Sequence, residues 1–142
     1  MGPITLWSDG SAIVRLSWDQ VAGPAPDPIL DQAAKELAEY AAGERQIFDV
    51  PLSLPASDFA NRFARALCAI PFGETLTYSD LARDLGVSAQ AIGQACGANR
   101  IPILIPCHRV LGASSLGGFS GGVGVDTKVW LLKHEGAAGL LI

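Results

Sequence analysis

The sequence predicts a mixed α/β protein, α+β in arrangement, in which a small antiparallel sheet with one helix precedes a helical part. Three observations predict this class. The first 18 residues have the pattern of a β-hairpin, later segments repeat apolar residues at helical spacing, and the charge balance changes near residue 55. The chain of 142 residues, 49% of them hydrophobic, can bury a core. We therefore expect one domain over residues 1–54 and a second over 55–142.

The N-terminal part opens with the expected hairpin. Asp9-Gly10 is a two-residue turn signal between two short runs of strand-forming residues. Further along, apolar residues recur at helical spacing up to Gly43, a typical helix end, and the segment after it contains Pro51 and stops at Pro55. We expect strands at residues 4–7 and 13–18, a loop at 23–28, a helix at 29–43 and an extended segment at 48–54.

The C-terminal part is predicted to be mainly helical. Ser57 or Asp58 can cap its first helix, Thr77 and Ser88 can cap the next two, and Gly86 can stop the helix between them. Two short helices joined by a tight turn form a helix-turn-helix pattern, which also occurs in proteins that do not bind DNA. We expect helices at residues 58–70, 77–85, 88–97 and 126–135.

Charge is distributed unevenly along the chain, although the net charge is −4. Residues 1–58 carry three basic and nine acidic residues, whereas residues 59–142 carry seven basic and five acidic residues. The second part could therefore approach a phosphate backbone, with modest affinity and modest salt dependence. Ordinary surface charge explains the same numbers equally well.

The three cysteines, Cys68, Cys96 and Cys107, form no CxxC pair. The N-terminus lacks the basic and apolar regions of a signal peptide, and no apolar run is long enough to span a bilayer. We expect a soluble cytoplasmic protein with reduced thiols, in which Cys68 and Cys96 fill the core. No cluster of cysteine and histidine offers four zinc ligands, so we expect no metal.

The strongest chemical signal is Pro106-Cys107-His108-Arg109-Val110, which places a thiol beside an imidazole. The thiolate is the nucleophilic form of cysteine, and a nearby base or positive charge promotes it. Neighbouring positions do not by themselves bring the two side chains together, so a bridging water is one way to connect them. An isolated Cys-His pair is more often a buried thiol without chemistry, and the flanking sequence decides between these interpretations.

The flanking sequence contains a series of motifs in a specific order. These are the segment from Ile70 to Ala82, Asn99 eight residues before the cysteine, the run Ile103-Leu104-Ile105-Pro106-Cys107-His108-Arg109-Val110, Gly118-Phe119-Ser120-Gly121-Gly122, and Leu131 to Gly136. In this order they resemble the O6-alkylguanine-DNA alkyltransferase family, whose active-site signature is similar to the run around Cys107. The resemblance is strong over residues 59–137 and weaker over 30–58.

The resemblance implies transfer of an alkyl group, such as methyl, from the O6 atom of guanine to Cys107, with O4-alkylthymine as a further substrate. His108 would draw off the thiol proton through a water, and Glu135 would orient His108 as a carboxylate does in a catalytic triad. Tyr78 would press on the nucleotide's phosphate and protonate the departing guanine. Asn99 would stabilise the turn before the active-site strand. A charge at a helix end for Glu135, and simple packing for Tyr78, are the alternatives.

The resemblance also implies which residues meet substrate and DNA. The backbone carbonyls of Cys107 and Val110 would read the guanine amine, Ser120 would bond near O6, and Pro102 and Phe119 would wall the alkyl pocket. The full set expected to contact substrate or DNA is Ala89, Gln90, Gly93, Pro102, Arg109, Val110, Phe119 and Ser120.

The expected partner is double-stranded DNA, bound through the minor groove with the damaged guanine flipped into the protein. The N-terminal part would be a trimmed ribonuclease H-like module. No cofactor is required, and the protein would act as a monomer. No group regenerates the thiol from a thioether, so each molecule would react once.

Some positions depart from the family pattern. Gln90 stands where the family usually has an arginine that fills the gap left by the flipped base, and it lacks the charge and broad plane of a guanidinium. Phe119 replaces a more usual tyrosine, and residues 59–64 lack a usual glutamine and tryptophan. Two other functions therefore stay open: a sensor that binds alkylated guanine and recruits repair factors, which Cys107 argues against, and a transcriptional regulator.

Overall fold

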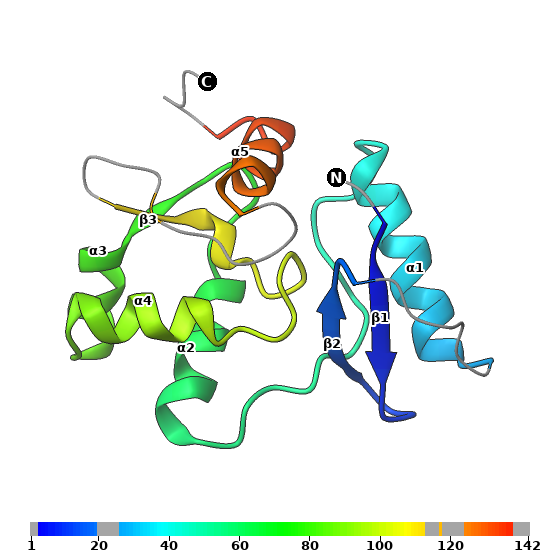
Figure 1. Cartoon of the computed structure of the whole chain (residues 1–142), viewed down its shortest axis with the longest axis horizontal. Coiled ribbons are helices and arrows are strands. Elements are labelled where there is room, and N and C mark those ends of the chain that lie inside the picture. The colour runs from blue at the N-terminus through cyan, green and yellow to red at the C-terminus, as the bar shows by residue number, and fades with distance from the viewer. Residues whose placement is uncertain (1–2, 20–25, 113–116, 118–123, 138–142) are drawn as a thin grey trace.

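The computed structural model describes residues 3–19, 26–112, 117 and 124–137, and places a small sheet-and-helix part beside a larger helical part (Figure 1). The elements in chain order are β1 (Thr5–Ser8), β2 (Ile13–Ser17), α1 (Pro28–Ala41), α2 (Asp58–Cys68), β3 (Leu76–Thr77), α3 (Tyr78–Leu85), α4 (Ala89–Gly97), the 3-10 turn η1 (Cys107–Arg109), β4 (Val110–Leu111) and α5 (Val125–His134). This arrangement confirms the predicted mixed α/β class, with a small antiparallel sheet in the N-terminal part.

The hairpin forms at the predicted place. β1 pairs antiparallel with β2, and Gly10 takes a positive φ of 94° in the turn between them. The Asp9 carboxylate accepts hydrogen bonds from two backbone amides of this turn, which close it. The segment predicted to be extended meets β2 at one isolated bridge, between Ile13 and Leu52, and does not add a third strand.

Helix α1 confirms the helix predicted after the proline-rich loop. The Asp27 carboxylate caps its first turn by accepting the amide two residues further on at 2.8 Å, and Gly43 follows its end with a φ of 79°. Ala33, Leu37 and Tyr40 lie on its buried face. This face packs on the hairpin, since α1 contacts both β1 and β2.

The caps of the C-terminal helices also lie where the sequence predicts. Ser57, not Asp58, caps α2. Thr77 and Asp80 form a reciprocal capping box at the start of α3, and Gly86 ends that helix in the left-handed conformation with a φ of 70°. Ser88 then caps α4. The two short helices and the tight turn between them are therefore confirmed as elements.

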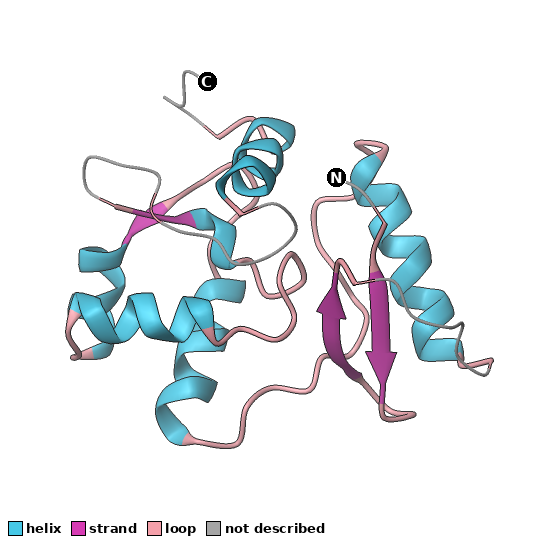
Figure 2. Cartoon of the chain, viewed as in Figure 1, coloured by secondary structure: helices cyan, strands magenta, loops and turns pink. Residues whose placement is uncertain are grey.

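Two features near the cysteine differ from the sequence expectations. Figure 2 shows a second small sheet in the helical part, in which β3 and β4 pair in parallel, Leu76 opposite Val110 and Thr77 opposite Leu111. Cys107 lies on the 3-10 turn η1, not on the strand that the family resemblance implies. Strands of two residues carry no alternating pattern, so they are recognisable only once folding has brought their segments together.

One buried cluster runs through both parts of the chain. It joins Ile13 and Leu16 of β2 to Phe63 and Leu67 of α2 and to the segment that leads to Cys107. At the same junction the backbone amide of Leu16 donates to the carbonyl of Arg100 at 2.9 Å. The N-terminal part is therefore packed and hydrogen-bonded against the segment that positions the cysteine.

Cys68 is exposed at the end of α2, so the prediction that it fills the core is wrong. It follows Leu67 by one residue, and a step of 100° around the helix carries it off the buried face. Cys96 is partly buried and packs against the core, as predicted.

Within the ranges that the model describes, no helix is long and apolar enough to cross a membrane.

Candidate active site

Cys107 begins the turn η1 and is almost fully buried, with 6% of its surface exposed. Asn99 supports the loop in front of it. The Asn99 amide nitrogen donates to the carbonyl of Ile105 at 2.8 Å, and its carbonyl oxygen accepts the amide of Ile101 at 3.0 Å. The amide of Cys107 in turn donates to the carbonyl of Ile105 at 2.8 Å. Asn99 therefore closes the loop that presents Cys107, which is the structural role that the resemblance implies.

This loop holds a strained residue. Ile103 has a φ of 72°, a conformation that a β-branched side chain rarely adopts and that costs about 1–3 kcal/mol. Its side chain is buried, and Asn99 ties the loop on both sides of it. The surrounding contacts therefore hold a backbone that the local sequence would not choose.

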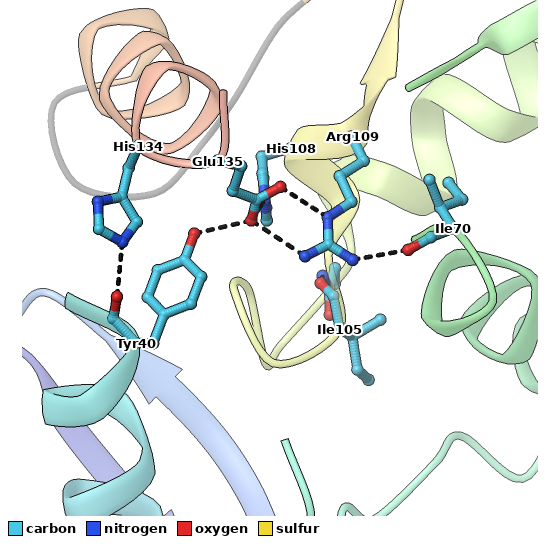
Figure 3. A network of polar contacts seen from close by, with 8 residues as sticks. Tyr40, Ile70, Ile105, His108, Arg109, His134 and Glu135 are labelled. Carbon is cyan, nitrogen blue, oxygen red and sulfur yellow. Dashed lines mark hydrogen bonds and ion pairs between the residues drawn. The ribbon is translucent and has the colours of Figure 1, made fainter. Parts of the chain in front are cut away.

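His108 is fully buried and is held by Glu135, which follows α5 (Figure 3). The Nε2 atom of His108 lies 2.7 Å from Oε2 of Glu135. The same carboxylate receives Nε of Arg109 on Oε1 at 2.8 Å and the Nη2 group of Arg109 on Oε2 at 3.0 Å. The hydroxyl of Tyr40 donates to Oε2 at 2.7 Å. Three side chains thus fix the position of one buried carboxylate.

The protonation states in this network follow from its charges. Burial raises the pKa of Glu135, but hydrogen bonds and charges from His108 and Arg109 outweigh it and lower the pKa to about 2. Burial lowers the pKa of His108 more than Glu135 raises it. Glu135 is therefore ionised and can only accept, so Nε2 of a neutral His108 must be the donor. The lone pair is then on Nδ1, which is buried and has no hydrogen-bond partner among the described residues.

The Cys107 thiol needs such a base. Burial raises its pKa, and a hydrogen bond with Asn99 and the charge of Lys128 oppose that effect only in part. The resting thiol is therefore protonated at neutral pH. A neutral imidazole with a free lone pair in the next residue is a suitable group to remove that proton.

Lys128 on α5 is part of this site, although the sequence reasoning did not select it. Its side chain is fully buried, and Nζ donates to the carbonyl of Val110 at 2.6 Å. It also lies 5.9 Å from the centre of the Tyr78 ring. The sequence did contain a signal that Lys128 is buried. It lies three and four residues before Leu131 and Leu132, and this spacing places the lysine on the buried face of its helix.

Tyr40 is a second residue that the sequence reasoning missed. The structure places it on the buried face of α1, three residues after Leu37. Its hydroxyl, however, reaches Glu135, which is 95 positions away in the chain. No local pattern could have indicated that contact.

Arg109 has a different position from the one expected. It was predicted to contact substrate or DNA, but its side chain is only 7% exposed and points inward. Besides Glu135, its Nη1 group donates to the carbonyl of Ile70 at 2.7 Å, and its guanidinium lies 5.9 Å from the centre of the Phe72 ring. The prediction is wrong because these internal partners occupy the guanidinium.

The remaining predicted residues differ in how far they are buried. Tyr78 begins α3 and is half-buried, and Gly117 packs so closely on its hydroxyl that any side chain at 117 would clash. Pro102 and Val110 are buried near the cysteine. Ala89, Gln90 and Gly93, which were expected to contact DNA, are exposed along α4. Phe119 and Ser120 lie outside the described residues.

The fold and the site define a class of protein in which a buried cysteine, next to an imidazole held by a carboxylate, is arranged to act as a nucleophile. Residues 1–54 match the family model described as the 6-O-methylguanine DNA methyltransferase, ribonuclease-like domain. Residues 58–137 match the model described as the DNA binding domain of the same family. The chain belongs to the 6-O-methylguanine DNA methyltransferase family.

Individual relatives agree with the family models. The methylated-DNA--protein-cysteine methyltransferase of Mycobacterium bovis is 42% identical over 145 residues, which cover 95% of this chain and 87% of that protein. The protein of the same name from Metallosphaera sedula is 37% identical over 142 residues, covering 96% and 88%. The crystal structure of Mycobacterium tuberculosis OGT in complex with DNA aligns with a TM-score of 0.84 at 41% identity, covering 95% of this chain and 87% of that one.

Proposed function

We propose that this protein repairs DNA by moving an alkyl group from O6 of guanine to the sulfur of Cys107. The observation that carries the proposal is the buried thiol beside a neutral His108, whose Nε2 proton is held by an ionised Glu135. The names of the relatives support it, since those of Mycobacterium bovis and Metallosphaera sedula are methylated-DNA--protein-cysteine methyltransferases.

The transfer exchanges one bond for another. His108 takes the thiol proton, directly or through a water, and the thiolate attacks the alkyl carbon. A carbon–sulfur bond forms as the bond from carbon to O6 breaks. The hydroxyl of Tyr78 protonates the departing guanine. The proton that His108 took from the thiol then replaces the one that Tyr78 lost, so the number of protons is unchanged. The product is a thioether, which no group in the site can hydrolyse, so each molecule reacts once.

The second part of the proposal concerns DNA. The pair α3 and α4 acts as a helix-turn-helix, with α4 in the minor groove and the target guanine flipped toward Cys107. Exposed Ala89 and Gly93 are small, and a side chain added at Gly93 would meet nothing within 4 Å, so a sugar-phosphate backbone can approach closely. The complex of the Mycobacterium tuberculosis relative with DNA supports this role.

The charge of the C-terminal part points to modest electrostatic binding. Arg109 and Lys128 are buried in the site, so five of the seven basic residues remain outside. Glu135 is also buried, which leaves four acidic residues outside. The affinity for DNA should therefore depend only weakly on salt.

We further propose that residues 1–54 and 55–142 are two domains, since one family model ends at residue 54 and the next begins at residue 58. A monomer is the proposed active form, since a single chain already brings Cys107, His108 and Glu135 together. A compartment that keeps thiols reduced, such as the cytoplasm, suits a cysteine acceptor.

The proposed function is tested by the mass of the protein after incubation with duplex DNA that contains one O6-methylguanine. We expect a gain of one methylene, about 14 Da, on the peptide that carries Cys107, because a methyl group replaces the thiol proton. Undamaged duplex of the same sequence is the control. An unchanged mass with retained selective binding to the damaged duplex would contradict transfer and support a sensor.

The exposed Gln90 gives a prediction about base flipping. Gln90→Arg should speed transfer from duplex DNA more than transfer from free O6-alkylguanine base, because an arginine adds charge near phosphates and a larger plane to fill the vacated stack. Unstacking a base costs on the order of a few kcal/mol, and the free base does not require it. The quantity to measure is the ratio of the two rates at fixed salt.

The matched control for this prediction is Gln94→Arg, which adds the same charge one turn further along α4. It should leave the ratio of rates near that of the wild-type protein. Equal acceleration by both variants would show that added charge alone is responsible, and equal acceleration of both substrates would show that Cys107 itself had become more reactive.

A further inference from the structure

Tyr40 is the one residue of the N-terminal part that hydrogen-bonds to the Glu135 carboxylate among the described residues. Its side chain leaves α1 and is fully buried. Its ring lies against Phe48, Phe72 and His134, with centroid distances of 5.4, 6.2 and 4.9 Å. Because three rings surround it, the phenol has a fixed position from which its hydroxyl points at Glu135 (Figure 3).

The same residue also holds the end of α5 through its backbone. The carbonyl of Tyr40 lies 2.5 Å from Nε2 of His134, the last residue of α5, and the Trp130 ring stacks on His134. Glu135 is the next residue and caps that helix. Helix ends fray when their groups lack partners, so a carboxylate at this position needs contacts from outside the helix to stay in place.

Tyr40 is a permanent donor to that carboxylate. Burial, followed by the negative charge of Glu135, raises the pKa of Tyr40 above that of an exposed tyrosine. The phenol therefore keeps its proton throughout the neutral range. Its hydrogen bond to Oε2, at 2.7 Å, is made to the same oxygen that holds His108.

We propose that Tyr40 is a positioning residue for alkyl transfer, and that the N-terminal part completes the catalytic site by holding Glu135 against His108. This inference rests on the proposed function and extends it to a residue of the other part of the chain. Among the described hydrogen bonds, the Tyr40 hydroxyl reaches this site through the Glu135 carboxylate, so we assign its effect to that carboxylate.

The proposal predicts a specific change in the pH dependence. Within the part of the chain that the structure describes, the charged and titratable groups near His108 are Cys107 and Arg109 on its own turn, Glu135 and Lys128 from the last helix and its cap, and the Tyr40 hydroxyl, which shares Oε2 of Glu135 with it. Removing the hydroxyl takes one donor from Oε2, so Glu135 attracts the His108 proton more strongly. The pKa of His108 then rises, and less of the neutral base is present at a given pH.

The test compares Tyr40→Phe with the wild-type protein in single-turnover transfer from an O6-methylguanine duplex between pH 5.5 and 9. We expect the rate at pH 7 to fall on the order of tenfold, the size typical of losing a hydrogen bond to a charged group. The acid limb of the profile should move to higher pH by up to roughly one unit. Phe48→Leu is the matched control, since it loosens the same ring packing but keeps the hydroxyl.

Two further variants make the result decisive. Site-specific replacement of Tyr40 by 3-fluorotyrosine keeps the side chain in place and strengthens the donor, so it should move the acid limb to lower pH. In a double-mutant cycle, adding Tyr40→Phe to Glu135→Gln should slow transfer little beyond Glu135→Gln alone, because both changes act on one carboxylate.

The proposal is overturned if Tyr40→Phe reacts with the wild-type rate and pH profile, or if Phe48→Leu moves the acid limb as far as Tyr40→Phe does. An acid limb that the fluorinated residue leaves in place would overturn it as well. Failure of the proposed function would give a different result, because the wild-type protein itself would then gain no mass on Cys107.

Discussion

Cys107→Ser is expected to abolish alkyl transfer and to leave DNA binding intact. The serine hydroxyl has a much higher pKa than the thiol, and a neutral His108 is too weak a base to ionise it. Loss of a nucleophile in such a unit slows a reaction by roughly a thousandfold or more. The measurement is single-turnover transfer of a radiolabelled methyl group, with fluorescence anisotropy on the same duplex for binding.

Cys96→Ser is the matched control for that experiment. Burial raises the pKa of Cys96 to about 12, and this thiol has no imidazole hydrogen-bonded to it among the described contacts. It should transfer at close to the wild-type rate. Transfer by the Cys107→Ser protein at the wild-type rate, or loss of transfer in both variants, would rule out Cys107 as the specific acceptor.

Arg109→Met is expected to have the largest effect on stability. The change keeps an apolar side chain but removes the cation from Glu135 and the donor from the carbonyl of Ile70. A buried carboxylate that loses its ion-pair partner typically costs about 3–5 kcal/mol. Urea denaturation at pH 7 should therefore show a much lower free energy of unfolding than for the wild-type protein.

The control for this loss of stability is Arg83→Met. Arg83 pairs with Asp80 at 3.0 Å on the surface, where the Arg83 side chain is 74% exposed. Such a pair contributes only about 0–1 kcal/mol. Equal decreases in the free energy of unfolding for the two variants would contradict the stabilising role of the buried Arg109.

The pH dependence gives a second check on Arg109. The pKa of Glu135 is lowered to about 2 in the folded protein, below the value of about 4.3 for a free glutamate. The stabilisation from this network is therefore present above the unfolded pKa and is lost as the pH falls toward 2. The difference between Arg109→Met and the wild-type protein should shrink over that range.

Much of the local structure was predictable because its causes lie within a few residues. The turn at Asp9-Gly10, the caps Thr77 and Ser88, and the helix end at Gly86 each depend on one side chain and the adjacent backbone. The motif around Cys107 was recognisable for the same reason, since its residues are contiguous. Such signals are present in the chain before it folds.

The contacts that complete the site arise only when distant segments meet. Arg109 follows His108 directly, yet nothing in that order indicates that its guanidinium turns inward to Glu135 and Ile70 instead of outward to DNA. Lys128 is buried although it is a lysine, and the carbonyl of Val110 accepts a hydrogen bond from its Nζ group. The pairing of β3 with β4 likewise forms only when residues 76–77 and 110–111 are brought together.

Local sequence thus specifies which residues can react, and the tertiary structure determines how they are held. Cys107 and His108 are neighbours in the chain, and their chemistry follows from residue type. The carboxylate that orients His108 is 27 positions away, and the phenol that reaches this carboxylate is 95 positions from it. A hydrogen bond has no sequence pattern of its own, so Tyr40 enters the site only because the core packs α1 beside the end of α5.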